Sequence, residues 1–288
     1  MLGRRPRLLR GLCLRAAAIL AALAAPTLAV ARDGPNEVDV ELILAVDISY
    51  SMDPEEQALQ RQGYVEALRS PEVLDAIKKG VNGKVAVTYV EWAGTTSQEV
   101  VADWMVIDGP ESAAEFTAQL AAKPIRRLYR TSISGAIDFS VPLFDKNAYR
   151  GLKQVIDISG DGSNNQGRPV TAARDEALAK GVTINGLPIM LNRPNGGFPE
   201  VEHLDEYYRD CVIGGAGAFM IPIRERAQFI EAIRTKILLE VATAPPPAWP
   251  ARVIPASATG NDLLKTQAEE PKTSCFFGER QWQQRWGN

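Results

Sequence analysis

The segment from Asp39 to Val46 carries a continuous apolar stretch that ends at an aspartate, Asp47. A strand with one exposed face alternates apolar and polar residues, whereas a continuous apolar stretch is typical of a strand that is buried on both faces. Such a strand needs helices on both sides of its sheet. This segment therefore indicates an α/β fold with a mainly parallel sheet.

The chain repeats the order of strand and helix as far as residue 241. Further strands are predicted over residues 84–92, 98–107, 153–159, 182–190 and 218–221, and helices over residues 53–69, from 71 onward, and over 111–122, 132–144, 169–180, 202–209 and 225–240. The turn at residues 94–96 is short enough for a hairpin, so the strand that follows it should run antiparallel at the sheet edge. We predict one α/β domain over residues 38–241, with a doubly wound, mostly parallel six-stranded sheet, one antiparallel edge strand, and helices on both faces.

The first 31 residues have the layout of a secretory signal peptide. Five arginines lead into an apolar run over residues 16–30, and Ala29-Val30-Ala31 places small residues where a signal peptidase cleaves. The apolar run, about fifteen residues, is shorter than the roughly 20 residues that cross a bilayer, so a cleaved signal is favoured over a membrane anchor. We expect a periplasmic or secreted protein with no stable membrane span after cleavage.

Charge excludes nucleic acid as a partner. The leader holds five of the 32 basic residues and none of the 35 acidic ones, so its removal leaves a net charge of −8. Phosphate backbones favour basic surfaces, and an acidic chain of this kind is a poor match for them.

Residues 242–288 differ in composition from the domain. Three consecutive prolines lie near their start, and the sequence through residue 270 is polar and small, which predicts a flexible tail. The aromatic end, from Phe276 to Trp286, has two interpretations. It docks on the domain or on another protein, or it is a weakly ordered end.

Two cysteines, Cys211 and Cys275, remain after cleavage of the leader. An exported protein meets an oxidising compartment, so a disulfide between them is one interpretation. The alternative is that Cys211 is a small buried hydrophobic residue and Cys275 is a free thiol in the tail.

Polar side chains follow two of the predicted strands. Asp47 ends the first strand, and Ser49 and Ser51 follow at alternate positions, which points all three side chains to one side of an extended loop. Asp161 follows the strand over residues 153–159 in the same way, between two glycines that allow sharp bending. Ligands of open parallel sheets bind beyond the carboxyl ends of the strands, where the strand order reverses, so we expect these residues to meet there.

Two carboxylates with several hydroxyls make a ligand set that contains only oxygen. Hard cations prefer such a set, so we expect Mg²⁺, with Mn²⁺ and Ca²⁺ as alternatives. The chain has a single histidine, His203. This argues against most zinc sites and against a Ser-His-Asp hydrolase.

The pattern Asp47-x-Ser49-x-Ser51, with Asp161 after a later strand, resembles the metal-ion-dependent adhesion site (MIDAS) of von Willebrand factor type A (vWA) domains. That family also has a threonine in a loop that leads into a helix, and Thr131 in Arg130-Thr131-Ser132 matches it. The family usually has Thr-Asp-Gly at the last motif, whereas this chain has Gly160-Asp161-Gly162, so only the aspartate is kept. The resemblance covers about 200 residues in the order of its elements, and extends to an uncharacterised bacterial exported branch.

The resemblance implies a binding module rather than an enzyme. Ser49, Ser51 and Thr131 would contact the cation directly or by exchange, and Asp47 and Asp161 would often act through water. A cation held mainly by neutral hydroxyls then seeks an acidic side chain, Asp or Glu, from a protein or peptide partner. Two alternatives stay open: a metal-assisted hydrolase that uses the same cation, and a structural subunit of an envelope assembly in which the metal only holds the loops.

Overall fold

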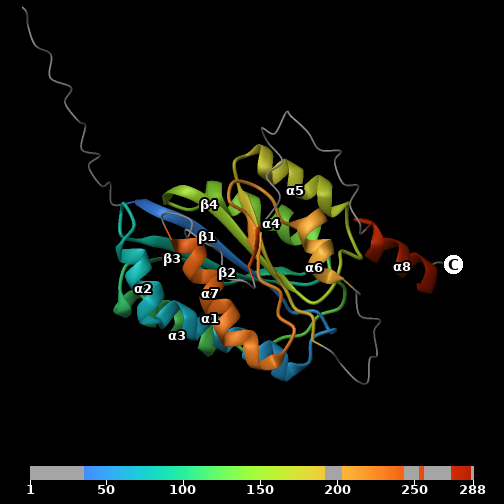
Figure 1. The fold of residues 1–288 in the computed structure, drawn as a ribbon, viewed down its shortest axis with the longest axis horizontal. Helices are drawn as coiled ribbons and strands as arrows, with labels where there is room; N and C mark the ends of the chain where they lie inside the picture. Colours follow the sequence, from blue (N-terminus) through green and yellow to red (C-terminus); the bar gives the residue numbers. More distant parts are fainter. Residues whose placement is uncertain (1–35, 192–202, 243–252, 256–273, 287–288) are drawn as a thin grey trace, which may run out of the picture. The chain divides into compact units, whose positions relative to one another are not determined.

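Strand β1 (Glu37–Asp47) lies at the centre of a seven-stranded sheet with the order β3-β2-β1-β4-β5-β6-β7 (Figure 1). The structure is a computed structural model that describes residues 36–191, 203–242, 253–255 and 274–286. All of these residues belong to one unit, Asp33–Asn288. The expected signal peptide, residues 1–31, lies outside the described residues.

The predicted order of strands and helices is the observed one, with additions near the end of the chain. The remaining strands are β2 (Val85–Trp92), β3 (Gln98–Ile107), β4 (Arg150–Gly160), β5 (Thr183–Pro188), β6 (Phe219–Met220) and β7 (Ile254–Pro255). The helices are α1 (Pro54–Arg69), α2 (Pro71–Lys78), α3 (Pro110–Ala122), α4 (Ile133–Lys146), α5 (Val170–Ala179), α6 (Leu204–Tyr207), α7 (Phe229–Val241) and α8 (Phe277–Trp286). A π-helical turn (Tyr208–Val212) continues α6, and a 3₁₀ turn (Arg226–Gln228) precedes α7.

The burial of β1 on both faces explains its apolar sequence. Leu42 and Leu44 pack in the core cluster that lies under α1, α2, α3 and α7, whereas Ile43 and Ala45 pack in the cluster under α4, α5 and α6. Figure 1 shows the two sets of helices on opposite faces of the sheet. The prediction of a doubly wound α/β fold is therefore confirmed.

The strand pairing also follows the prediction. Strands β2, β1, β4, β5 and β6 are parallel, and β3 pairs antiparallel with β2 at one edge of the sheet. Helix α1 begins as its sequence predicts, because Asp53 and Glu56 form a reciprocal capping box and a proline occupies the first helical position. Among the described helices, none is both long and apolar enough to cross a membrane.

Two pieces of the predicted tail are described, and both are attached to the domain. The two-residue strand β7 pairs antiparallel with β6, which adds a seventh strand to the six that the sequence predicts. Cys275, just before α8, forms a disulfide with Cys211. The other parts of the tail, residues 243–252, 256–273 and 287–288, lie outside the described residues.

A buried ionic cluster joins α7 to the sheet. The Nζ of Lys236 lies 2.8 Å from Asp157 Oδ1 and also contacts Glu240, and all three side chains are fully buried. Asn185 donates to Glu240 at 3.0 Å, and the Tyr64 hydroxyl donates to Asp157 at 3.3 Å. Two carboxyl groups share one ammonium, so the cluster holds an excess of acidic groups.

This excess predicts a pH dependence of stability. Burial, with the charge of Asp157 acting in the same direction, raises the pKa of Glu240 from 4.5 to about 7, although Lys236 and Asn185 oppose the shift. The folded protein then holds this proton more tightly than the unfolded chain, so the contribution of Glu240 to the free energy of unfolding falls as pH rises from about 4.5 to about 7. Above that range the loss is complete.

We therefore compare the free energies of unfolding of Glu240→Gln and the natural protein. The difference, variant minus natural protein, should rise between pH 5 and 7 and level off by pH 8. Urea unfolding at each pH measures the difference. Two stability curves that stay parallel across this range would contradict the assignment.

Candidate functional site

The five residues that the sequence predicts as metal ligands lie at the carboxyl ends of β1 and β4 and on the loop before α4. Parallel pairing sets Val46 of β1 beside Ser159 of β4, so Asp47 and the loop with Asp161 come to the same edge of the sheet. The chain continues from β1 toward β2 on one side and returns to β4 on the other. This is the reversal of strand order at which open α/β sheets bind ligands.

Hydrogen bonds join four of the five residues. Asp47 Oδ1 accepts from the backbone N–H of Ser49 at 2.7 Å, which fixes the turn after β1. The hydroxyls of Ser49 and Ser51 lie 2.7 Å apart, and Ser51 donates to Asp161 Oδ1 at 2.6 Å. The oxygens of the two motifs therefore form one continuous chain.

Thr131 reaches the same place through its loop. Its backbone N–H donates to Asn165 Oδ1 at 3.0 Å, and its carbonyl accepts from the N–H of Asn165 at 2.8 Å. Its hydroxyl faces the glycine after Asp161, because a Cβ built on Gly162 would lie 3.6 Å from Thr131 Oγ1. Thr131 therefore lies beside the Asp161 loop, although no hydrogen bond joins its hydroxyl to the other four residues in the described structure.

The loops of the site are also joined to one another by their backbones. The N–H of Tyr50 donates to the carbonyl of Leu128 at 2.9 Å, and the N–H of Leu128 donates to the carbonyl of Ile48 at the same distance. The N–H of Ser132 donates to the carbonyl of Ala93 at 2.7 Å, at the end of β2. The serine loop and the threonine loop are therefore held in register by the ends of two strands.

Asp47 is in an electrostatically unfavourable place. Its side chain is fully buried, and Oδ2 has no hydrogen-bond partner. Burial, followed by the nearby charge of Asp161, raises its pKa well above the usual range, although hydrogen bonds from Ser49 act in the opposite direction. Gly160 leaves space beside this oxygen, since a Cβ there would lie 2.9 Å from Asp47 Oδ2.

These features fit a divalent cation. Asp47 has a buried carboxylate oxygen without a partner, and it lies beside a second carboxylate and a row of hydroxyls, which favours a positive charge at this place. No group of three or more His, Cys, Asp or Glu side chains that could hold a metal occurs among the described residues. A set of two aspartates and three hydroxyls is of a different kind, because three of its five side chains are neutral.

The site depends on residues that the sequence analysis did not single out. Asn164 accepts from the N–H of Ser134 at 3.0 Å through Oδ1, and its own N–H donates to the Tyr207 hydroxyl at 3.2 Å. The Tyr208 hydroxyl lies 3.5 Å from the carbonyl of Gly160. The one available signal was the pair of asparagines that directly follows the Asp161 motif, because amide side chains in a loop commonly bind backbone groups.

An aromatic pair stands on the rim of the site. The rings of Tyr50 and Tyr129 stack with centroids 4.3 Å apart, and the Arg127 guanidinium lies 4.5 Å from the Tyr50 ring. Tyr129 is 71% exposed although it is large and aromatic. Tyr50 lies between the two serines in the sequence, so this aromatic pair belongs to the loop that carries them.

The three arginines before Thr131 have different partners. Arg126 pairs with Glu91 at 3.2 Å and with Glu99, so its charge is compensated. Arg127 also donates to the Tyr50 carbonyl at 2.7 Å, and Arg130 lies over the Trp282 ring at 3.7 Å. The last two guanidinium groups therefore contact aromatic rings and add positive charge near the site.

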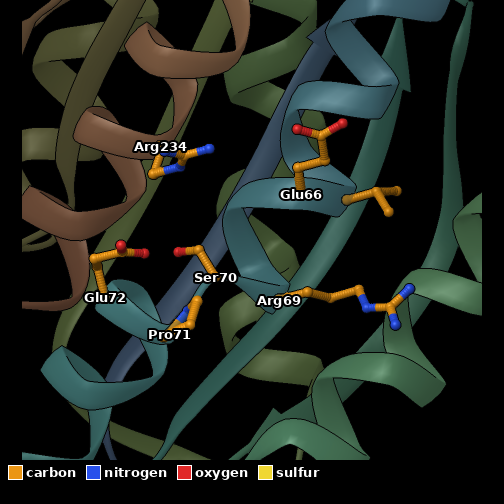
Figure 2. Close-up of a pocket in the computed structure, with 7 residues that line it drawn as sticks. Glu66, Arg69, Ser70, Pro71, Glu72 and Arg234 are labelled. Carbon is orange, nitrogen blue, oxygen red and sulfur yellow. The ribbon is translucent and has the colours of Figure 1, made fainter.

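A pocket elsewhere on the molecule is separate from this site. It lies where α1, α2 and α7 meet, and charged side chains of both signs line it, among them Glu66, Arg69, Glu72 and Arg234 (Figure 2). These residues lie near the carboxyl end of α1, whereas the candidate site lies before its first residue. A helix of 16 residues is about 24 Å long, so the two places are far apart.

The sheet is mostly parallel, with β3 and β7 antiparallel at its two edges and helices on both faces, which is the vWA type of α/β fold. The chain belongs to the family described as "Protein of unknown function (DUF1194)", which matches residues 37–245. No curated protein matches the chain.

Solved structures share this fold at low sequence identity. Proximal thread matrix protein 1 from the mussel byssus, solved with a zinc-occupied MIDAS motif, is 14% identical with a TM-score of 0.51 and covers 72% of this chain and 48% of its own. The pilus adhesin SpaC from Lactobacillus rhamnosus GG is 10% identical with a TM-score of 0.50 and covers 71% of this chain and 31% of its own. A von Willebrand factor type A protein from Catenulispora acidiphila is 15% identical with a TM-score of 0.48, and the match covers 71% of this chain and 43% of that protein. The chain thus spans about half the length of these proteins or less.

The charge on Asp47 gives a direct prediction. Without divalent cations, Asp47→Asn should raise the free energy of unfolding at pH 7 by on the order of 1 kcal/mol, because it removes a buried charge and its repulsion with Asp161. Urea unfolding in EDTA measures the change. The variant keeps the oxygen that accepts from Ser49, so a loss of stability in EDTA would show that the carboxylate itself stabilises the fold.

Proposed function

We propose that this protein is a metal-dependent binding module that recognises an acidic group of a protein or peptide partner through a divalent cation. The observation that carries the proposal is the buried Oδ2 of Asp47, which lacks a partner beside a second carboxylate and a row of hydroxyls. A cation satisfies this oxygen and neutralises the two aspartates. Capping and turn formation account for single serines and threonines but not for this joint placement.

The residues that would hold the cation are Asp47, Ser49, Ser51, Thr131 and Asp161. Their oxygens suit Mg²⁺ best, with Mn²⁺ and Ca²⁺ as alternatives. The zinc-occupied MIDAS motif of the mussel protein supports a divalent cation in this fold. When bound, the cation would supply an electrophilic centre that attracts a carboxylate, because its direct ligands would be mostly neutral hydroxyls while the two aspartates would act largely through water.

The surroundings of the site favour an anionic partner with an apolar neighbour to its acidic group. Arg127 and Arg130 add positive charge, and the exposed ring of Tyr129, stacked on Tyr50, offers an apolar surface. Exposed aromatic rings and arginines are the side chains that contribute most to protein interfaces. The neighbouring carboxylates Asp47 and Asp161 would repel an acidic partner if no cation were bound.

We place this module outside the cytoplasm. The first 31 residues have the layout of a signal peptide, and the disulfide between Cys211 and Cys275 is of the kind that persists in oxidising compartments. A pilus adhesin and a matrix protein of the mussel byssus share the fold, which agrees with this placement.

A peptide library tests this function and does not require a known partner. We expect panning of displayed random peptides on the protein in Mg²⁺, followed by elution with EDTA, to enrich sequences with Asp or Glu. Binding should fall about tenfold or more when the acid becomes Asn or Gln, since one charged contact is lost. Thr131→Ala should lower binding to a similar extent, whereas Thr96→Ala, the same change at an exposed position, should not.

The opposite results separate the alternatives. Peptides that bind equally in EDTA, or that lack an acidic residue, would contradict the proposal. Cleavage of the bound peptides in Mg²⁺ would favour a hydrolase instead. Cation binding without any selected peptide would favour a structural subunit.

A further inference from the structure

The C-terminal helix α8 packs directly against the loop that follows Asp161. A Cβ built on Gly278 would lie 2.2 Å from the carbonyl oxygen of Asn164 and 2.5 Å from Ser163 Oγ, so the helix approaches this loop as closely as a glycine allows. Glu279 Oε1 accepts from Asn164 Nδ2 at 2.8 Å. Helix α8 and the loop are therefore held together by close packing at Gly278 and by a hydrogen bond to the Glu279 carboxylate.

Asn164 connects α8 to the candidate site through further hydrogen bonds of its side chain. The same side chain accepts from the N–H of Ser134, three residues after Thr131, and donates to the carbonyl of Arg168 at 3.2 Å. It thus holds the start of α4 and both ends of the loop after Asp161. Glu279 and the carbonyl of Arg168 together fix the orientation of this amide, because both are acceptors that face Nδ2 while Oδ1 faces Ser134.

A second contact from α8 reaches the residue before Thr131. Arg130 has a φ of 79°, in the left-handed region that side chains other than glycine rarely adopt. Its guanidinium lies 3.7 Å from the centre of the Trp282 ring. This cation–π contact opposes relaxation of the strained backbone and so keeps Thr131 turned toward the Asp161 loop.

The disulfide explains how so short a helix stays in place. Helix α8 has 10 residues, and isolated helices below about 12 residues are marginal in water. Cys275 anchors its start to Cys211, which is fully buried in the π-helical turn beside Tyr207 and Tyr208. The hydroxyls of these tyrosines contact Asn164 and Gly160, so the disulfide is attached to the same residues that hold the Asp161 loop.

We propose that α8 is a positioning element of the candidate cation site, held by the Cys211–Cys275 disulfide. It acts through Glu279 on Asn164 and through Trp282 on Arg130, and none of its described residues is a cation ligand. This role rests on the proposed function, because it presumes that the site binds a cation. Its consequence is that cation affinity depends on an intact disulfide at a distance from the ligands.

Calorimetric titration of Mn²⁺ into the full chain tests this role. Relative to the oxidised natural protein, Trp282→Ala and Cys275→Ala should each weaken binding about tenfold, as is common for residues that support metal ligands. Trp282→Phe, which keeps a ring under Arg130, should retain most of the affinity. Gln283→Ala, an exposed change on the same helix, should have no effect.

Reduction and hydrogen exchange complete the test. Dithiothreitol reduces the disulfide to two thiols and is itself oxidised to its cyclic disulfide. It should lower the Mn²⁺ affinity of the natural protein to the level of Cys275→Ala, and it should leave the Mn²⁺ affinity of Cys275→Ala unchanged. Amide exchange in Trp282→Ala should quicken around Thr131 and residues 161–168 but not in β1. Faster exchange throughout the sheet would overturn the positioning role in favour of a general loss of stability.

The failures of the two proposals are distinguishable. If the natural protein binds Mn²⁺ and every variant binds it equally, the role of α8 is overturned and the proposed function stands. If the oxidised natural protein binds no Mn²⁺, the proposed function fails and the role of α8 fails with it.

Discussion

The parallel pairing of β1 with β4 is the constraint on which the rest of the structure depends. Both strands are buried in the middle of the sheet, and their register brings Asp47 and Asp161 to one place at its edge. Asp47 is fully buried, and a buried carboxylate beside a second one costs free energy unless a positive charge or hydrogen bonds compensate it. The fold therefore builds an unfavourable electrostatic arrangement at the edge where α/β sheets bind ligands, which is typical of a functional site.

The surrounding loops keep this arrangement in place. Ser49 is held by pairing with Leu128, Ser51 by its hydrogen bonds to Ser49 and Asp161, and Thr131 by Asn165. The network extends through Asn164 to the disulfide-anchored helix α8. A site whose hydroxyls are fixed in advance loses little conformational freedom when a ligand binds, so more of the interaction energy appears as affinity.

Much of the fold could be predicted because its signals are local. The apolar stretch of β1 indicates burial on both faces, the capping residues Asp53 and Glu56 mark the start of α1, and a short turn identifies the antiparallel strand β3. The two aspartates could be placed for the same reason, since each directly follows a buried strand. The contacts of α8 with Asn164 and Arg130 could not be predicted in detail, because each joins segments more than 100 residues apart in sequence. The strand β7 has only two residues and pairs through backbone groups, so its sequence carries no periodic signal.

The most direct test of the account is the position of a bound cation. Crystals of the oxidised protein grown with Mn²⁺ should show an anomalous difference peak at the carboxyl ends of β1 and β4, among the oxygens of Ser49, Ser51, Thr131 and Asp161 and close to Asp47. This peak should be absent from Asp47→Asn crystals grown in the same way. Crystals of the natural protein with no peak there at a saturating Mn²⁺ concentration, or with a peak only elsewhere, would contradict it.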